Sequence, residues 1–237
     1  MKRAIVIGAS SGIGKELSRV LVKNNYIVGV TGRRGKLLED LKKENTDSFI
    51  VQVFDVKDTD NVSSNLDCLV KKLGGLDLFV VCAGSIKVNN NLDFELEKSV
   101  IDVNVSGFTS LVDWGFNFFK SQKSGHIVAL SSISGLRGNR LVPCYSASKA
   151  YQINYLEGLR LRVGVDENIF ITDVCPGLVD TPMQKSGDTF WMVSAEKAAG
   201  QIFKAIDQKK EFVYVSKRWR FIAWFFNLVP WWLYKRM

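Results

Sequence analysis

A tyrosine and a lysine four residues apart, Tyr145 and Lys149, are the pair in this sequence best suited to acid–base chemistry. On a helix they share one face, so the ammonium group can act on the phenol. A free phenol has a pKa near ~10, which makes it a poor acid or base at neutral pH. A nearby lysine cation, and any further positive charge bound beside the phenol, would lower that pKa. The spacing alone occurs often by chance, so the remainder of the chain decides its meaning.

Two serines, Ser131 and Ser132, follow the apolar run 126–130 and precede the tyrosine–lysine pair. A hydroxyl group at the end of a buried strand could polarise a substrate carbonyl. Together with the phenol, it would serve a reaction that interconverts a carbonyl and an alcohol.

A glycine-rich turn follows the first apolar run and opens a helix; its residues are Gly8, Ala9, Ser10, Ser11, Gly12, Ile13 and Gly14. The pyrophosphate of a dinucleotide binds backbone N–H groups at a helix N-terminus, where the helix dipole favours negative charge. Glycines permit the tight turn and remove Cβ atoms that would block close approach. A sharp turn without a ligand is the alternative, but the strand before it and the helix after it favour a phosphate site.

The second apolar run is followed by Arg33 and Arg34 and by no acid. A carboxylate here would hold the ribose 2′-hydroxyl of NAD, whereas an arginine suits the 2′-phosphate of NADP. We therefore predict NADP(H) in preference to NAD(H), with Arg33 as the main phosphate contact and Arg34 as a second candidate. The alternative is that both arginines belong to a solvated loop.

Short apolar runs alternate with segments of helical spacing along most of the chain. Strands are predicted at residues 2–7, 26–30, 49–54, 76–81, 126–130, 169–174 and 211–215. Helices are predicted at residues 13–24, 35–44, 59–72, 94–121, 144–165 and 194–207. Strands that are apolar throughout are typical of a parallel sheet covered on both faces. We expect an α/β fold: a single doubly wound Rossmann-type domain, residues 1–215, with a parallel sheet of about seven strands and helices on both faces.

The glycine spacing GxxxGxG, the later YxxxK pair and their order resemble the short-chain dehydrogenase/reductase family over residues 2–215. Gly-Ala-Ser-Ser-Gly-Ile-Gly is a frequent form of the cofactor loop in that family. The resemblance implies an oxidoreductase that transfers hydride between a nicotinamide and a carbonyl/alcohol pair. One departure stands after the fourth strand, where Cys82 replaces an asparagine before Ala83 and Gly84 and removes side-chain hydrogen bonds that brace the sheet.

The resemblance implies four catalytic residues. The family's serine lies thirteen positions before the tyrosine, which selects Ser132 over Ser131, and it would orient the carbonyl. Tyr145 would donate a proton to the developing alkoxide, while Lys149 would lower the pKa of the tyrosine and hold the nicotinamide ribose. Asn104 matches the family's asparagine, which holds a water in a proton relay to the lysine.

Further cofactor contacts follow from the same resemblance. Asp55 and Val56 match a pair that contacts adenine, and the loop 176–182 resembles the family's loop over the nicotinamide, where Val179 and Thr181 would contact the carboxamide. The expected cofactor-binding set is Gly8, Ser10, Ser11, Gly12, Ile13, Gly14, Arg33, Arg34, Asp55, Val56, Ala83, Gly84, Tyr145, Lys149, Pro176, Gly177, Val179 and Thr181.

Residues 183–192 stand where the family keeps its substrate lid. Phe190, Trp191 and Met192 either line an apolar pocket or pack on the core. Members of the family are commonly homodimers or homotetramers, packed through the helices that bear Asn104 and Tyr145.

Charge and composition exclude several functions. The net charge is +8, of which +6 falls in residues 209–237 and +2 in all the rest, so we expect no nucleic-acid-binding face. His126, the only histidine, lies in an apolar run, and no two of the four cysteines form a CxxC pair, so no metal site is expected. The apolar stretch 4–7 is too short for a signal peptide. We expect a cytoplasmic protein, or one at the cytoplasmic face of a membrane.

The C-terminal segment, residues 216–237, combines four tryptophans with the cations Lys217, Arg218, Arg220, Lys235 and Arg236. It is too short and too interrupted to span a bilayer, which needs ~20 apolar residues. Aromatic residues bordered by cations suit the headgroup boundary, which predicts a monotopic membrane anchor and, with it, an apolar or lipid-like substrate. The alternative is a segment that packs on its own domain, or across a dimer, and completes the substrate pocket.

Two other functions remain on the same scaffold. One is a non-catalytic protein that senses the cofactor or is recruited to a membrane; the complete set Ser132, Tyr145, Lys149 and Asn104 argues against it. The other is a sugar-nucleotide epimerase or dehydratase, which usually has a longer substrate domain than this chain provides after its sixth strand.

Overall fold

The computed structural model describes residues 1–165, 167–183 and 191–236. Its centre is a seven-stranded parallel sheet in the order β3-β2-β1-β4-β5-β6-β9. The strands are β1 (Lys2–Ile7), β2 (Tyr26–Gly32), β3 (Phe49–Val53), β4 (Leu78–Val81), β5 (Ser124–Leu130), β6 (Asn168–Pro176) and β9 (Phe212–Val215). A separate pair is formed by β7 (Val179–Asp180) and β8 (Val193–Ser194). The predicted fold class is confirmed.

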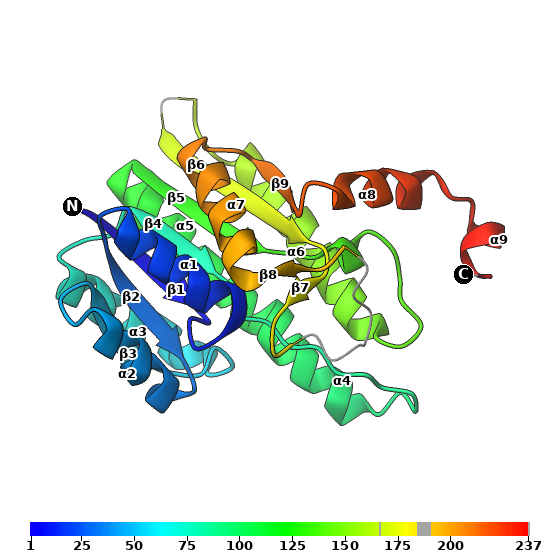
Figure 1. The fold of residues 1–237 in the computed structure, drawn as a ribbon, viewed down its shortest axis with the longest axis horizontal. Coiled ribbons are helices and arrows are strands. Elements are labelled where there is room, and N and C mark those ends of the chain that lie inside the picture. Colours follow the sequence, from blue (N-terminus) through cyan, green and yellow to red (C-terminus); the bar gives the residue numbers. More distant parts are fainter. Residues whose placement is uncertain (166, 184–190, 237) are drawn as a thin grey trace.

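Helices cover both faces of the sheet (Figure 1). The α-helices in the described part of the chain are α1 (Gly12–Lys23), α2 (Gly35–Glu44), α3 (Thr59–Leu73), α4 (Phe94–Ile101), α5 (Phe108–Gln122), α6 (Pro143–Leu161), α7 (Ala195–Asp207), α8 (Trp219–Leu228) and α9 (Trp231–Tyr234). The hydrophobic core with α1, α2 and α7 lies on one side, and the core with α3, α5 and α6 lies on the other.

Strand β1 shows why the apolar runs form this sheet. Ala4 and Val6 face the core with α1, whereas Ile5 and Ile7 face the core with α3, and all four are fully buried. Successive side chains of a strand point to opposite faces, so a strand covered on both sides must be apolar at every position.

The order of the strands reverses between β1 and β4, because the chain first adds β2 and β3 on one side and then returns to build the other. Loops at the carboxyl ends of the two strands then diverge and leave a crevice, which is where open α/β sheets bind their ligands.

The predicted helix at 94–121 is wrong in one respect, because a π-helix, η1 (Asp102–Gly107), divides it into α4 and α5. At this point the backbone approaches the loop after β3: a Cβ atom on Gly107 would lie 2.5 Å from the carbonyl oxygen of Val56. A wider helical turn here also carries Asn104, and π-turns are frequent at functional sites.

None of the helices in the described part of the chain is long and apolar enough to cross a membrane.

Candidate active site

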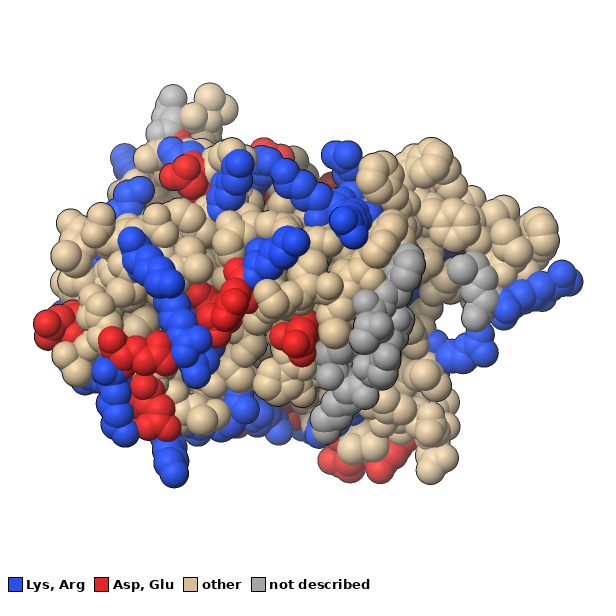
Figure 2. Space-filling view, in the orientation of Figure 1, with Lys and Arg blue, Asp and Glu red and all other residues tan. Residues whose placement is uncertain are grey.

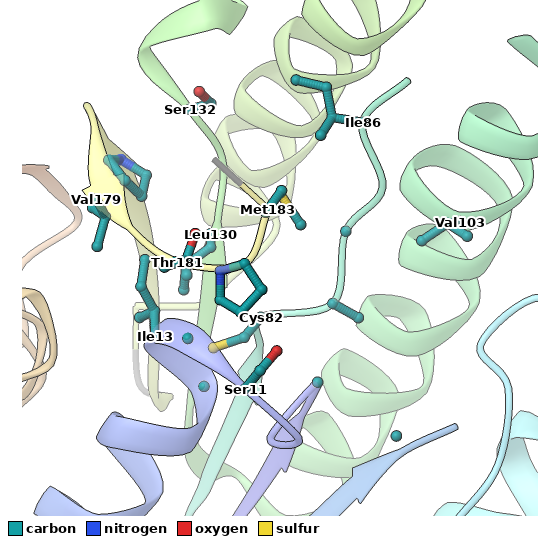
Figure 3. A pocket seen from close by; sticks show the side chains of 18 of the residues that line it. Ser11, Ile13, Cys82, Ile86, Val103, Leu130, Ser132, Val179, Thr181 and Met183 are labelled. Carbon is teal, nitrogen blue, oxygen red and sulfur yellow. The ribbon is translucent and has the colours of Figure 1, made fainter. Parts of the chain in front are cut away.

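Loops at the carboxyl ends of the strands surround one cavity at the point where the strand order reverses (Figure 3). Its volume is about 320 Å³, within the range of small-molecule sites. Every residue of the predicted cofactor set lines it: Gly8, Ser10, Ser11, Gly12, Ile13, Gly14, Arg33, Arg34, Asp55, Val56, Ala83, Gly84, Tyr145, Lys149, Pro176, Gly177, Val179 and Thr181. Ser132 also lines the cavity, whereas Asn104 is fully buried behind its wall.

At two glycines of the glycine-rich loop, Gly8 and Gly14, there is no space for a side chain. A Cβ atom on Gly14 would lie 2.4 Å from the carbonyl oxygen of Gly8, and one on Gly8 would lie 2.8 Å from the backbone nitrogen of Ala83. Gly8 also has a φ of 87°, in the left-handed region that favours glycine. Helix α1 begins at Gly12, and the side chain of its N-cap residue, Ser11, makes no capping hydrogen bond. The first N–H groups of α1 therefore lie at the cavity without a side-chain cap, which suits a pyrophosphate group.

Both predicted 2′-phosphate contacts lie on this cavity, but their own contacts differ. Arg34 donates from Nη2 to the hydroxyl oxygens of Ser10 and Ser11, at 2.7 and 2.6 Å. Arg33 lies 3.7 Å from the carboxylate of Asp55, and its side chain is 67% exposed. Arg34 is thus held against the glycine-rich loop, and Arg33 extends from the rim toward solvent.

Tyr145 and Ser132 lie together at the opposite part of the wall. Tyr145 stands in the first turn of α6, where Val100 and Val142 pack around it, and it is almost fully buried. The Ser132 hydroxyl accepts a hydrogen bond from the backbone N–H of Ser134 at 3.1 Å, which fixes the serine at the start of a short 3-10 helix, η2 (Ile133–Gly135). Burial raises the pKa of Tyr145, and a hydrogen bond with Ser132 opposes the rise.

Lys149 is buried one turn beyond the tyrosine on α6. Its ammonium group donates to the carbonyl oxygen of Leu130 at 2.7 Å and to Oε1 of Gln152 at 2.8 Å. Its Nζ atom lies 5.8 Å from the centre of the Tyr145 ring. Burial lowers the pKa of Lys149 to about 8, and the nearby carboxyl group of Asp173 opposes that change.

The sequence predicts that Lys149 lowers the pKa of Tyr145. In the structure the two residues share one face of α6, as expected, but the pKa of Tyr145 is raised because burial outweighs its polar contacts. The ammonium group meanwhile forms its hydrogen bonds with Leu130 and Gln152. In this structure Lys149 is therefore not among the groups that lower the pKa of Tyr145.

Asn104, on η1, is held by hydrogen bonds on both sides of its amide. It donates from Nδ2 to the carbonyl oxygen of Ser85 at 2.8 Å and to the hydroxyl of Ser148 at 3.0 Å, and its Oδ1 accepts from the Ser85 N–H at 2.8 Å. The backbone carbonyl of Asn104 accepts from Nε2 of Gln152 at 2.8 Å. Gln152 therefore links Asn104 directly to Lys149.

Gln152 is the functional residue that the sequence analysis missed. It is fully buried and contacts Lys149 through its oxygen and Asn104 through its nitrogen. Its position three residues after Lys149 places it on the same helical face, and that spacing is the signal by which it could have been found.

Cys82, the departure from the family pattern, lies on the cavity next to the glycine-rich loop. Its Cβ atom would be 3.2 Å from a Cβ on Gly14. Burial raises the pKa of the Cys82 thiol to about 12, so the group stays protonated and packs as a small apolar side chain.

Apolar side chains surround the part of the cavity near Ser132 and Tyr145. They are Ile86, Ile133, Leu178 and Met183, two of which are labelled in Figure 3. Of the predicted lid residues, Trp191 packs edge-on against Trp219 with ring centres 6.5 Å apart, Met192 is half-buried, and Phe190 lies outside the described residues. The described part of this region thus contributes apolar side chains to the cavity wall.

His126 lies away from this cavity. Its Nε2 atom lies 2.7 Å from the hydroxyl of Thr172, and burial lowers its pKa to about 4. These contacts agree with the structural role predicted for it.

Comparison of the sequence with protein families gives a match over residues 2–190 to the family described as short chain dehydrogenase. An uncharacterized oxidoreductase of Staphylococcus haemolyticus is 32% identical over 78% of this chain and 81% of its own length. Another from Staphylococcus saprophyticus is 33% identical over 80% of this chain and 82% of its own length.

Two solved structures share the fold. The structure of ElxO with NADP bound has a TM-score of 0.79 and 24% identity, and the alignment covers 90% of this chain and 94% of ElxO. A tyrosine-to-phenylalanine variant of ElxO with NADPH bound has a TM-score of 0.82 and 23% identity, covering 91% and 97%.

Proposed function

The chain belongs to the short-chain dehydrogenase/reductase family, and from that premise we propose that it is an NADP(H)-dependent oxidoreductase that interconverts a carbonyl and an alcohol on an apolar small molecule. The observation that carries the proposal is the convergence of Ser132, Tyr145 and Lys149 on the wall of one cavity that begins at a glycine-rich helix N-terminus.

The cavity fits a dinucleotide in three respects. The glycine-rich loop leaves backbone N–H groups accessible to a pyrophosphate, two arginines adjoin that loop, and Lys149 lies at the far end where a nicotinamide ribose would stand. When bound, the reduced cofactor supplies the hydride. The backbone of Val179 and the hydroxyl of Thr181 would hold its carboxamide.

The residues of this chain then have distinct tasks. Ser132 donates a hydrogen bond to the substrate carbonyl oxygen and orients it, and Tyr145 donates the proton that the alkoxide oxygen needs. Burial raises the pKa of the phenol, so it carries its proton at neutral pH, and the positive charges of Lys149 and of a bound nicotinamide would lower that pKa when the proton is transferred. Lys149 binds the ribose and stabilises the phenolate left behind, and Asn104, through Gln152, holds the lysine in place.

The preference for NADP(H) over NAD(H) rests on Arg33 and Arg34. Two cations and no acid directly follow β2, where the ribose 2′ group of a bound dinucleotide would stand. The NADP and NADPH present in the ElxO structures add support, because those structures share this fold.

An apolar substrate is supported by the side chains near Tyr145, namely Ile86, Ile133, Leu178 and Met183. A homodimer or homotetramer and a cytoplasmic location, at a membrane face or away from it, remain predictions from the sequence. So does a division of the chain into a catalytic domain, 1–215, and a C-terminal segment, 216–237.

The test is the oxidation of NADPH by the purified chain in mild detergent, against ketones that run from small polar compounds to steroids and long-chain ketones. We expect turnover of an apolar ketone that Tyr145→Phe abolishes and that Tyr151→Phe, a matched change on α6 at a residue outside the cavity, leaves intact. Tight NADPH binding with no turnover on any ketone would instead favour a cofactor-sensing protein.

Cofactor choice is tested by replacing each arginine with alanine. A charge-assisted hydrogen bond contributes about 1.5–3 kcal/mol, so we expect NADPH to bind roughly tenfold to a hundredfold more weakly, with NADH binding unchanged. Arg162→Ala, at the end of α6, is the control. Equal losses for NADPH and NADH would contradict the assignment of the 2′-phosphate to these residues.

A further inference from the structure

Helix α8 has two apolar faces, and one of them is docked on the protein. Trp219, Ile222, Ala223 and Phe226 recur at i, i+3, i+4 and i+7, and they pack with Cys175, Ile133 and their neighbours in one hydrophobic cluster. The indole of Trp219 lies directly over Gly177, where even a Cβ atom would come within 2.2 Å of it. The helix is therefore attached to the loop that lines the nicotinamide end of the cavity.

The opposite face of α8 is equally apolar but exposed. Phe221, Trp224, Phe225 and Leu228 repeat the same i, i+3, i+4, i+7 spacing, and Trp224 is 68% exposed. Trp231 and Trp232 in α9 are also exposed, at 68% and 59%. Figure 1 shows α8 and α9 projecting from the end of the molecule. We call these six residues the aromatic stripe. Large apolar side chains that gather exposed on one segment mark an interaction site.

A second region of contacts holds the segment in a fixed position. Arg137 donates from Nε and Nη2 to the carbonyl oxygens of Phe226 and Val229, at 2.8 and 2.6 Å, at the end of α8. The guanidinium also lies 5.4 Å from the ring centre of Tyr234, whose hydroxyl donates to the carbonyl of Gly138 at 2.7 Å. The segment is thus fastened to the loop between Ser132 and Tyr145, which orients the aromatic stripe relative to the cavity.

Cations border the aromatic stripe at both ends. They are Lys217, Arg218 and Arg220 near the start of α8 and Lys235 and Arg236 after α9, and all five are exposed. No acid occurs in residues 212–237. Figure 2 shows uncharged side chains over the region of α8 and α9, with Lys and Arg at its tip. The partner must therefore offer an apolar interior and a negatively charged border.

A second copy of this chain does not meet that requirement. Two-fold pairing of the aromatic stripe would bring five cations against the same five cations, since an isologous contact places the same patch on both sides. An anionic lipid surface supplies both properties at once, because tryptophans favour the headgroup boundary and each lysine or arginine near it adds to the attraction.

We propose that the aromatic stripe and its five bordering cations are a docking surface for the face of an anionic lipid bilayer. Helix α8 lies along the boundary with its exposed face in the lipid and its other face on the catalytic loops. Because a helix with its side chains is about 10 Å across, the loop that carries Gly177 is held about that far from the acyl chains. If the proposed reductase activity holds, an apolar substrate reaches the cavity from the membrane.

The first test is sedimentation of the full chain with vesicles of phosphatidylcholine alone or mixed with phosphatidylglycerol, without cofactor or substrate. We expect binding to the anionic vesicles that falls at least tenfold in the double variant Trp224→Ser with Leu228→Ser. The matched control is Phe94→Ser with Leu161→Ser, two exposed apolar residues on α4 and α6. Thermal unfolding of each variant checks that the fold is retained.

The second test removes charge. One kcal/mol per cation corresponds to about a fivefold change in partitioning, so we expect the triple variant Lys217→Gln, Arg218→Gln, Arg220→Gln to bind anionic vesicles roughly a hundredfold more weakly. The control removes the same charge elsewhere, at Lys23, Lys71 and Lys204.

Three results would overturn the proposal: equal binding to neutral and anionic vesicles, equal loss in a variant and its control, or a stripe-dependent dimer that does not bind vesicles. Since this assay contains neither cofactor nor ketone, its outcome is independent of whether the reductase activity is found.

Discussion

Gln152 allows a quantitative test of how the site sets the charge of Lys149. Replacement of the glutamine by leucine removes one of two hydrogen-bond acceptors from a buried ammonium group and leaves the carbonyl of Leu130. A hydrogen bond to a charged group contributes about 1.5–3 kcal/mol, and one pKa unit corresponds to about 1.4 kcal/mol. The pKa of Lys149, already lowered by burial to about 8, should therefore fall by a further ~1–2 units.

The direct assay is a pH titration of the Nζ signal of Lys149 by NMR on selectively labelled protein. A lysine loses its charge as the pH rises through its pKa, so the alkaline limb of NADPH-dependent ketone reduction should move to lower pH by the same amount. Gln152→Glu places a carboxylate at the same position and should move both measurements in the opposite direction. Gln201→Leu, on α7, is the control.

The reasoning is refuted if the pKa of Lys149 in Gln152→Leu stays within a few tenths of the wild-type value. If Gln152 had only a structural role, its replacement would lower the stability of the protein but leave the pKa of Lys149 unchanged. The leucine and glutamate substitutions would then not shift the pH profile in opposite directions.

Two further predictions concern stability. Gly14→Ala should lower the free energy of unfolding by about 1–3 kcal/mol, because the new Cβ would meet the backbone of Gly8; Gly200→Ala, with open space on α7, should raise it by about 0.5–1 kcal/mol in the same urea titration. The pKa of His126, lowered by burial to about 4, lies below its ordinary value. The unfolded chain thus binds more protons between roughly pH 6.5 and 4, and the histidine should cost about 3 kcal/mol of stability as the pH falls through that window. In His126→Gln, calorimetry across the window should show a loss smaller by that amount; an unchanged loss would assign the acid sensitivity to other groups.

The fold was predictable because its causes are local to each strand. Residues 4–7 are apolar without alternation, which only a doubly covered parallel strand requires, and the same holds for residues 78–81. The meeting of the candidate site residues in one cavity was predictable for a related reason. In a parallel sheet the carboxyl ends of all strands lie at one edge, so the motifs that follow strands, from Gly8 to Thr181, meet there.

What could not be predicted depends on contacts between distant segments. The π-helix at Asn104 arises where the backbone at Gly107 approaches Val56, and nothing in residues 94–121 records that approach. The C-terminal segment is a second element whose packing depends on distant residues. Its two interleaved apolar faces are visible in the sequence, but contacts with distant residues, among them Gly177, Cys175 and Ile133, determine which face is docked. Packing on the protein therefore concerns one face of α8, and the proposed membrane contact concerns the opposite, exposed face.

Burial affects the charge states of Tyr145 and Lys149 in related ways. Burial raises the pKa of the phenol and lowers that of the ammonium group, so the apolar surroundings disfavour the charged form of both. The phenolate left by proton donation would be a buried anion, and its cost is reduced when the lysine beside it is charged. Gln152 and Leu130 stabilise the charged form of Lys149 near neutral pH, because each accepts a hydrogen bond from its ammonium group. In the proposed reaction Gln152 would therefore act on the tyrosine through the lysine, which is the role of a positioning residue.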